Sequence, residues 1–333
     1  MLAFMVSLSL VLALQPAFIR WVRARQFGQP IRDDGPRGHL SKQGTPTMGG
    51  VVIVIAVVSS TLLFSDLSNV HLWAIIGVCI GFAVLGFVDD YKKVRDRTSK
   101  GISARAKLLW QIGLAAVASA LLLTFAPNFS TQVTVPFLKN VYIDLGYWFI
   151  PFAVLVIVGC SNAVNLTDGL DGLVIGPVMT VAFAYGVIAY VAGHAGLANY
   201  LQIPYLAGSG ELSVFAAAVV AGGLGFLWYN AYPAQVFMGD VGSLSLGASL
   251  GMLAISTKQE LVLMLAGGVF VLEALSVIAQ VTSFKLTGKR VFRMAPLHHH
   301  FELEGVAEPK IIVRCWILSI VLAVLTIATL KLR

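Results

Sequence analysis

The sequence predicts an all-α integral membrane protein that crosses the bilayer ten times. Hydrophobic residues make up 58% of its 333 residues and charged residues only 12%, and the mean hydropathy is +0.85. This composition is far from that of a soluble domain. The apolar residues also fall into runs of the length that crosses the hydrocarbon core, which takes about 20 residues. The polar stretches between them are short, so we expect a single transmembrane domain over residues 1–333.

The ten expected spans lie at about 2–21, 48–65, 71–88, 108–126, 145–161, 173–193, 213–230, 241–256, 261–283 and 311–330. The first run lacks a basic segment before it and a small-residue cleavage site, so we interpret it as a transmembrane helix and not as a signal peptide. The three cysteines, Cys79, Cys160 and Cys315, lie in or beside apolar runs. They are expected to be small buried hydrophobic residues and not a disulfide or zinc set.

The distribution of basic residues predicts the orientation. The loops 22–47, 89–107 and 284–310, with the adjoining helix ends, hold nineteen of the 23 lysines and arginines. By the positive-inside rule these loops lie in the cytoplasm, and both termini lie outside. The loops 162–172 and 231–240 then fall on the cytoplasmic side as well. This topology accounts for the net charge of +7, and no nucleic-acid partner is expected.

The conspicuous polar motifs all fall on this cytoplasmic face, whereas Glu273 is the one carboxylate inside an expected span. An intramembrane carboxylate is costly and usually faces the bundle interior. We expect Glu273 either to make a structural hydrogen bond at a helix kink or to line a substrate groove. A transporter more often places its polar groups near the bilayer midplane. The sequence therefore favours chemistry at the cytoplasmic surface, where a soluble substrate can meet a lipid.

The densest polar stretch is Asn162–Gly172. Asp168 and Asp171 are three residues apart, so a helix beginning there would place both on one face. Gly169 and Gly172 allow the backbone to approach a flat ligand closely. This stretch predicts a binding site for a polar ligand or a metal, and a capping turn is the alternative.

A pair of adjacent carboxylates, Asp89 and Asp90, ends the third expected span. Such neighbours repel each other at an apolar boundary, so a cation, a divalent metal or a shared proton must offset them. The alternative is an ordinary charged helix end. Neighbouring helical residues point about 100° apart, so both are expected to reach one site only if the helix ends there.

Three further segments carry candidate ligands. Ser41–Gly50 combines Lys42 with hydroxyls and glycine amides, which suits phosphate although the spacing is not that of a Walker A motif. In Trp228–Ser243, Phe237 could stack on a base and Asp240 could bind magnesium. A turn with an N-cap, and an aromatic belt followed by a cap, are the respective alternatives.

The histidine run His298, His299 and His300 lies in Met294–Glu302. Three consecutive side chains diverge in any regular structure, so we expect them to donate to phosphate or to a carboxylate and not to bind zinc. Carboxylates, a lysine and histidines on one membrane face together predict metal-assisted phosphoryl transfer.

Five segments together resemble the phospho-N-acetylmuramoyl-pentapeptide transferase family, with the closest likeness to its Gram-negative members. They are Ser41–Gly50, Phe87–Lys92, Asn162–Gly172, Tyr232–Ser243 and Ala295–Glu302. The resemblance covers nearly the whole chain. The Pro-Leu-His-His-His-Phe-Glu run distinguishes this branch from related polyprenyl-phosphate N-acetylhexosamine-phosphate transferases, which have a different histidine loop.

The resemblance implies ten transmembrane helices, an extracytoplasmic N-terminus and a homodimer in the bacterial inner membrane. It also implies a longer extracytoplasmic segment before the first span than this sequence carries. The implied reaction moves phospho-MurNAc-pentapeptide from UDP-MurNAc-pentapeptide to undecaprenyl phosphate, with lipid I and UMP as products and Mg²⁺ as cofactor. The alternatives are a transferase for UDP-GlcNAc, against which the histidine loop argues, and, in a different class, a lipid or solute transporter.

The resemblance also implies residue roles. Asp240 would bind Mg²⁺, Asp89 would act as base on the lipid phosphate, and Asp90 would support Asp89 or the metal. Lys42 and the loop His298–His300 would bind phosphate or hold the aspartates. The residues implied for the nucleoside and sugar side are Asn165, Asp168, Gly169, Leu170, Asp171, Asn230 and Phe237, with Lys107 and Thr47 as weaker additions.

Two mechanisms are open for such a reaction. In the first, the lipid phosphate attacks the pyrophosphate directly, and in the second an aspartate attacks first and forms a phospho-enzyme. A phosphate monoester has a second pKa of about 6, so it is largely ionised at neutral pH. Direct attack is therefore favoured, with Asp89 acting as much to position the phosphate as to remove a proton.

Overall fold

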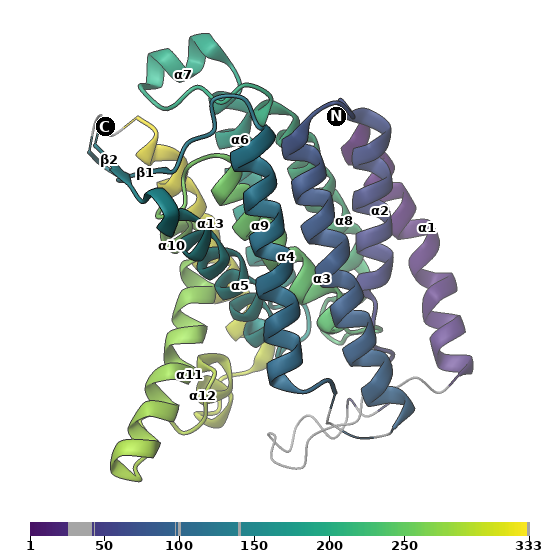
Figure 1. Ribbon diagram of the computed structural model, residues 1–333. Helices are drawn as coiled ribbons and strands as arrows, with labels where there is room; N and C mark the ends of the chain where they lie inside the picture. Colours follow the sequence, from purple (N-terminus) through teal and green to yellow (C-terminus); the bar gives the residue numbers. More distant parts are fainter. Residues whose placement is uncertain (26–41, 43, 97, 99–100, 139–140, 332–333) are drawn as a thin grey trace.

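The computed structural model describes residues 1–25, 42, 44–96, 98, 101–138 and 141–331. Most of the expected loop 22–47, with Ser41 and Gln43, lies outside these residues. The described chain is almost wholly helical (Figure 1). Its helices are α1 (Leu2–Ala24), α2 (Gly50–Phe64), α3 (Val70–Arg95), α4 (Ala104–Phe125), α5 (Phe149–Thr167), α6 (Ile175–Ala192), α7 (Ala195–Leu201), α8 (Leu212–Asn230), α9 (Gly239–Ser256), α10 (Leu263–Ala266), α11 (Gly268–Thr287), α12 (Leu297–Leu303) and α13 (Glu308–Thr329). Two short strands, β1 (Gln132–Thr134) and β2 (Tyr142–Asp144), pair antiparallel.

Eight of the described helices are long and apolar enough to cross a bilayer, so the chain is a polytopic membrane protein. They are α1, α3, α4, α6, α11 and α13, together with α5 and α8 each extended by a preceding 3-10 turn. Each of the ten expected spans contains a helix. The two beyond these eight are α2, which has 15 residues, and α9, which is rich in glycine and serine.

Helix α9 lies at the centre of the bundle. Every residue from Val241 to Ser256 is buried, and its main neighbours are α3 and α5. The glycines of α9 allow this close packing: a β-carbon on Gly247 would come within 2.8 Å of Ser161, and one on Gly251 within 2.7 Å of Ile157. Small residues at helix interfaces are the usual means of close packing in a membrane, where apolar contact with lipid is equally available.

Four helices, α1, α3, α5 and α11, continue beyond their expected apolar spans. The extension is greatest for α3 and α5, so the loops 89–107 and 162–172 begin later than predicted. Helix α3 runs to Arg95 and α5 runs to Thr167. Hydropathy misplaces these ends because the polar side chains there find partners. Lys93 pairs with the aspartates one turn earlier in α3, and Asn162 donates both to Gln111 of α4 and to Val158 within α5.

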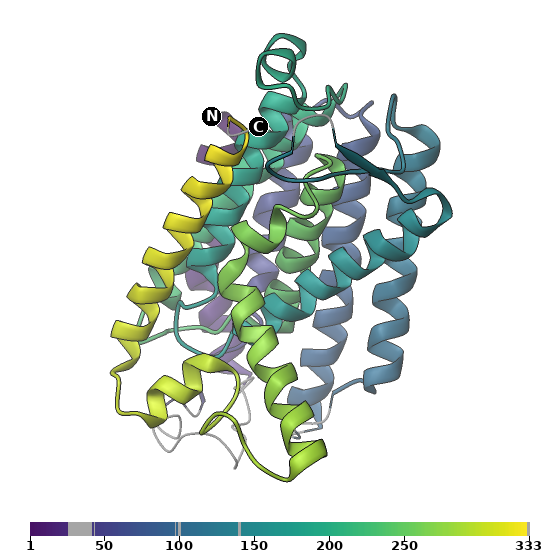
Figure 2. The ribbon, with the colours of Figure 1, turned by 90° about the vertical axis from the view of Figure 1, so that its left-hand side faces the viewer.

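The two ends of the bundle differ in what they carry. Figures 1 and 2 show both termini, α7 and the strands at one end, and the C-terminal half of α11 with α12 at the other. This second end also holds the C-terminal ends of α1 and α3 and the start of α4. The polar motifs therefore gather at one end of the protein.

Candidate active site

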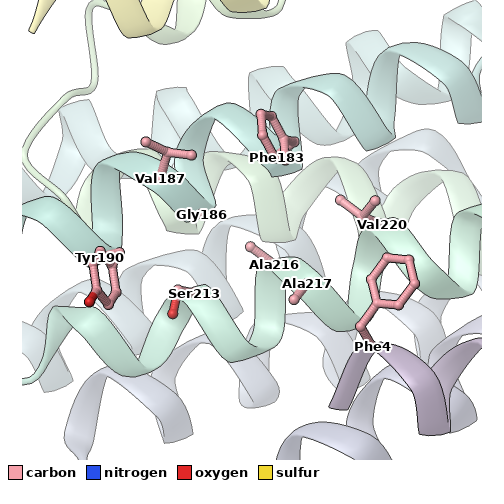
Figure 3. A pocket seen from close by; sticks show the side chains of 9 residues that line it. All are labelled: Phe4, Phe183, Gly186, Val187, Tyr190, Ser213, Ala216, Ala217 and Val220. Carbon is pink, nitrogen blue, oxygen red and sulfur yellow. The ribbon is translucent and has the colours of Figure 1, made fainter. Parts of the chain in front are cut away.

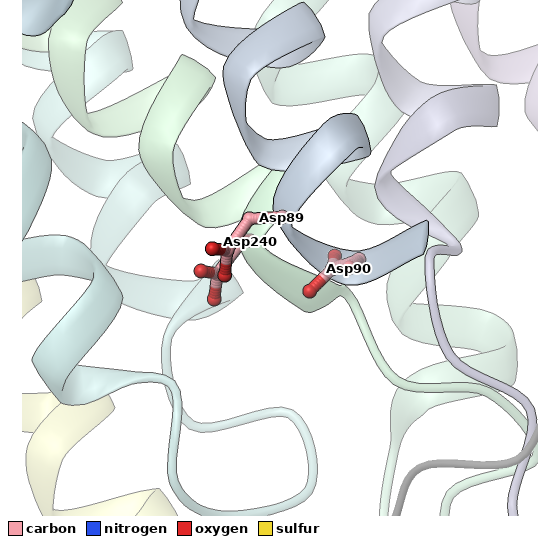
Figure 4. Close-up of side chains that lie close together, drawn as sticks. All are labelled: Asp89, Asp90 and Asp240. Atoms are coloured by element: carbon pink, nitrogen blue, oxygen red, sulfur yellow. The ribbon is translucent and has the colours of Figure 1, made fainter. Parts of the chain in front are cut away.

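Three aspartates from two helices converge at this end (Figure 4). Asp89 and Asp90 lie in the last turns of α3, and Asp240 lies in the first turn of α9. One carboxylate oxygen from each lies within 4.8 Å of the others. Asp89 is 3% exposed and Asp90 6%. A cluster of negative charges this deeply buried requires compensating cations.

Close packing of α2, α3 and α9 brings the aspartates together. A β-carbon on Gly50 would meet the backbone of Gly242 at 2.3 Å, and one on Gly86 would meet that of Asp240 at the same distance. The expectation that Asp89 and Asp90 share a site only if α3 ends there is wrong, because α3 continues to Arg95. The start of α9 lies so close to α3 that both carboxylates reach it: Asp90 Oδ2 accepts the N–H of Val241 at 3.3 Å.

Two lysines neutralise most of the cluster's charge. Lys93 Nζ lies 2.6 Å from Asp89 Oδ2, 3.6 Å from Asp90 Oδ1 and 3.2 Å from Asp240 Oδ2. Lys107 Nζ, from α4, lies 2.7 Å from Asp240 Oδ2 and 3.9 Å from Asp89 Oδ2. Lys107 was expected near the site, whereas Lys93 was not assigned a role. Lys93 follows Asp90 by three residues and Asp89 by four, and this helical spacing is the signal that could have identified it.

Neighbouring amides fix the orientation of the carboxylates. Asn165 Nδ2, near the end of α5, donates to Asp240 Oδ1 at 2.9 Å and to Ser243 Oγ at 2.8 Å. Ser243 in turn donates to the carbonyl oxygen of Gly239 at 3.0 Å. The N–H of Ile102 donates to Asp89 Oδ1 at 2.7 Å. Asn165 was expected to line the nucleoside side, and the structure places its amide on the aspartate cluster.

A second polar group forms around Lys42. Its ammonium lies 2.7 Å from Asp171 Oδ1 and 2.6 Å from Glu308 Oε1. Burial alone would lower the pKa of Lys42, but its hydrogen bonds to Asp171 and Glu308 raise it above the usual value. Asp171 Oδ2 also accepts the N–H of Ala234 at 2.9 Å. Lys42 thus holds an aspartate, one of the two roles implied for it.

The turn 168–172 connects these two groups. Asp168 is half-buried, and burial raises its pKa to about 8, with further contributions from the negative charges of Asp240, Asp90 and Asp171. Gly172 has φ +74°, a conformation that glycine adopts without steric cost. Leu170 is buried and packs with Leu173, Ile311 and Ile312.

The histidine loop packs on the same turn. His298 is 1% exposed. Its ring lies directly against Gly169, because a β-carbon built on Gly169 would come within 2.2 Å of His298 Nε2. Glu273 Oε2 accepts the backbone N–H of His298 at 3.4 Å and lies 3.3 Å from its Nδ1. These contacts join Glu273 to the histidine loop, while the two roles expected for it, a hydrogen bond at a helix kink and the lining of a substrate groove, stay predictions. His299 and His300 pair with glutamates of their own loop, Glu302 at 2.7 Å and Glu304 at 3.4 Å.

The remaining expected residues lie around the start of α9. Thr47 is buried, and its Oγ1 would lie 3.2 Å from a β-carbon on Gly239. Phe237 is half-buried, and its backbone N–H donates to Pro46 O at 2.8 Å. Asn230 is 3% exposed and donates to Val236 O at 2.9 Å, which closes its own loop. The side chains of Asn230 and Leu170 therefore make contacts within the protein itself.

Two apolar hollows lie elsewhere on the bundle. One, of about 350 Å³, lies between α1, α6 and α8 and is lined by residues such as Phe4, Phe183 and Val220 (Figure 3). The other, of about 270 Å³, shares Phe183 and Val220 and extends to α13. Hydrocarbon side chains dominate both linings, so neither hollow offers groups that would bind a nucleotide or a phosphate.

Comparison with known proteins decides the family. The model of glycosyl transferase family 4 matches residues 72–258, and that of phospho-N-acetylmuramoyl-pentapeptide-transferase signature 1 matches residues 42–54. The chain is 58% identical over 331 residues to the phospho-N-acetylmuramoyl-pentapeptide-transferase of Pelobacter propionicus, covering 99% of this chain and 92% of that protein. Coverage is the same for the proteins of that name from Syntrophus aciditrophicus, at 55% identity, and Oleidesulfovibrio alaskensis, at 53%.

The chain belongs to the phospho-N-acetylmuramoyl-pentapeptide-transferase family.

The matched ranges cover much of the site. The signature of the phospho-N-acetylmuramoyl-pentapeptide-transferases includes Lys42 and Thr47, and the larger family model includes the three clustered aspartates. Glu273, the histidine loop and Glu308 lie beyond residue 258, outside both matched ranges. Contacts with Lys42, Asp171 and Gly169 connect these residues to the matched ranges.

Proposed function

We propose that the protein transfers phospho-MurNAc-pentapeptide from UDP-MurNAc-pentapeptide to undecaprenyl phosphate, giving lipid I and UMP. The observation that carries the proposal is the buried Asp89, Asp90 and Asp240 cluster with its two lysines, at one end of a membrane helix bundle in a chain of this family. Such a cluster suits a reaction between two anionic phosphates, in which charge neutralisation is the largest catalytic contribution.

The orientation is part of the proposal. We infer ten membrane-spanning helices in the bacterial inner membrane, with both termini outside the cytoplasm and the aspartate cluster facing it. The excess of lysine and arginine in the expected cytoplasmic loops supports this orientation, because the C-terminal ends of α1 and α3 and the start of α4, which flank two of those loops, lie at the cluster's end. A UDP-linked substrate would then arrive from the cytoplasm and a polyprenyl phosphate from the bilayer. A homodimer, which the family resemblance implies, completes the proposed state.

The cluster suits Mg²⁺. This ion binds through one or two carboxylates and keeps water on its other positions for phosphate oxygens. Asp240 would hold the ion together with Asp89 or Asp90, because their oxygens lie within 4.8 Å of one another. A carboxylate oxygen has two lone pairs, so the hydrogen bonds from Asn165 and Ile102 still leave acceptor capacity. When bound, Mg²⁺ would neutralise charge on the pyrophosphate oxygens.

The chain's own residues supply the remaining steps. Lys93 and Lys107 place positive charge beside the carboxylates, where it attracts the phosphates of both substrates. Asp89 positions the lipid phosphate and accepts its remaining proton. The ionised phosphate oxygen then attacks the sugar-linked phosphorus and forms a new P–O bond, and the bond to UMP breaks. Trapping a covalent phosphoryl-aspartate during turnover would replace this direct attack by the two-step mechanism.

The deciding experiment is UMP release by the purified protein in detergent or nanodiscs. Release should require UDP-MurNAc-pentapeptide, undecaprenyl phosphate and Mg²⁺ together. UDP-GlcNAc in place of the muramoyl substrate tests the related transferase activity, and its efficient turnover would reassign the substrate. Absence of UMP under every condition would remove the enzyme assignment.

Asp240→Asn tests the metal assignment. The amide is close to isosteric and keeps an oxygen for Asn165, but it is neutral and a weak Mg²⁺ ligand. We expect activity to fall by about 100-fold or more, the scale of losing a central electrostatic group in an active site, with little change in thermal stability. Asp96→Asn, in the solvent-exposed C-cap of α3, is the matched control and should stay active.

A further inference from the structure

Glu308 lies in the first turn of α13 and reaches two other segments of the site. Its Oε1 lies 2.6 Å from Lys42 Nζ, a residue 266 positions away in the chain. The same oxygen accepts the backbone N–H of Asp171 at 3.0 Å. The side chain of Glu308 is 12% exposed and that of Lys42 16%, so water screens this pair only weakly.

These contacts fasten the turn 168–172 through Asp171. Its N–H is held by Glu308, its Oδ1 by Lys42 and its Oδ2 by the N–H of Ala234. Lys42 is shared by two carboxylates, so the group of three carries one net negative charge and keeps the ammonium occupied. The same turn carries Asp168, which is close enough to Asp240 and Asp90 to interact with them electrostatically, and Gly169, which lies against the His298 ring. A shift of Glu308 would therefore be transmitted to both.

A role of Glu308 confined to its own helix would not account for these contacts. A carboxylate in the first turn of a helix stabilises that helix through the helix dipole. That effect needs no partner, whereas Glu308 is in contact with Lys42 and with the backbone of Asp171. The dipole effect alone would change stability and leave the binding of one substrate relative to the other unchanged.

We propose that Glu308 is a positioning residue, which acts through Lys42 and Asp171 to hold the turn 168–172 in the arrangement that binds the UDP-linked substrate. The proposal rests on the proposed function. Three substitutions separate the contacts. Glu308→Gln keeps an oxygen for the Asp171 N–H and loses the charge, Glu308→Ala loses both, and Glu308→Asp keeps the charge on a shorter side chain. Lys310→Gln, on an exposed residue of the same turn, is the control.

The kinetic readout compares the two substrates. For Glu308→Gln we expect KM for UDP-MurNAc-pentapeptide to rise about tenfold, as for the loss of one charge-assisted hydrogen bond. KM for undecaprenyl phosphate and kcat should change little, Glu308→Ala should be worse, and Glu308→Asp should recover part of the loss. Equal changes in both KM values, or none, would overturn the proposal. Activity of the unmodified protein in the same assay separates this failure from failure of the proposed function.

A second readout needs no turnover. Mass spectrometry after brief lysine acylation reports the reactivity of Lys42, which its two carboxylate partners keep protonated and shielded. Glu308→Gln should accelerate acylation of Lys42, and Lys310→Gln should not. A Lys42→Met, Glu308→Gln double variant should bind the UDP-linked substrate no more weakly than Lys42→Met alone. Additive losses, or unchanged Lys42 reactivity, would show that Glu308 does not act through Lys42.

Discussion

Gly86 of α3 lies directly against the backbone of Asp240: a β-carbon built on Gly86 would come within 2.3 Å of the Asp240 carbonyl oxygen. That oxygen belongs to a backbone inside a packed helix pair and cannot rotate away as a side chain would. The approach of α3 to α9, which brings Asp89 and Asp90 to Asp240, therefore depends on the absence of a side chain at position 86.

Gly86→Ala should separate the two helices and disperse the aspartate cluster. A displacement of about 1 Å in an active site can cost about 100-fold in rate, so we expect UMP release to fall on that scale. Gly77→Ala is the matched control, because Gly77 lies on the same helix and a β-carbon there meets no described atom within 4 Å. If Gly86→Ala released UMP at the rate of Gly77→Ala, the aspartate cluster would not be the reaction site.

Lys93→Met should change the Mg²⁺ requirement. The Lys93 ammonium lies within 3.6 Å of all three carboxylates, so it competes with a metal ion for the same oxygens. We expect the Mg²⁺ concentration for half-maximal UMP release to fall about tenfold, which corresponds to roughly 1.4 kcal/mol. The maximal rate should fall too, because a positive charge next to the phosphates is lost. Lys92→Met, on the exposed neighbour, should keep the original Mg²⁺ dependence.

Hydropathy and charge predicted much of the fold. The positions of the helices follow from runs of apolar residues, and each expected span contains a helix. The ends of α3 and α5 could not be predicted in this way, because Lys93 and Asn162 find partners that only the packed bundle supplies. The central position of α9 was equally hidden, since glycine and serine lower its hydropathy while they allow its neighbours to approach.

The sequence predicted which residues belong to the aspartate cluster better than it predicted their contacts. Asp89, Asp90 and Asp240 were chosen for their chemistry, and the structure brings them together. Glu308 was not chosen, because a lone carboxylate before an apolar run resembles an ordinary helix start. Its significance comes from Lys42 and Asp171, which are distant in the chain. Sequence spacing can reveal a partner one helical turn away, as for Lys93, but not a partner on another helix.

Gly169→Ala should act through His298. A β-carbon at position 169 would lie 2.2 Å from His298 Nε2, and Glu273 holds that histidine from its other side. We expect the substitution to push the histidine loop away from the turn and to lower kcat/KM for the UDP-linked substrate about tenfold, less than the ~100-fold that a misplacement of about 1 Å in an active site can cost.

The control for this prediction is a double variant in which the steric clash is removed. His298→Ala removes the ring that the new methyl group would meet, so Gly169→Ala should add almost no loss in a His298→Ala background. Contacting residues are expected to be non-additive in this way. Fully additive losses in the double variant would show that the two residues act independently. Gly159→Ala, on α5 where a β-carbon meets no described atom within 4 Å, should be neutral in both backgrounds.

Asp168 should make folding stability depend on pH. Burial and the neighbouring carboxylates raise its pKa from 3.8 to about 8 in the folded protein. Between these two values the folded state retains a proton that the unfolded state has released. The unfolded state thus binds fewer protons, so the contribution of Asp168 to stability decreases as pH rises from about 4 to about 8.

Asp168→Asn removes this dependence, because an amide does not titrate. We expect the thermal midpoint of Asp168→Asn, relative to that of the unmodified protein, to increase steadily between pH 5 and pH 8.5 in the same detergent. Asp144→Asn is the comparison: Thr131 and Gly146 hold the pKa of Asp144 below its usual value, so its contribution is already complete at pH 5 and the difference in midpoint should stay constant. A constant difference for Asp168→Asn as well would mean that Asp168 is ionised in the fold throughout this range, with a cation close enough to stabilise it.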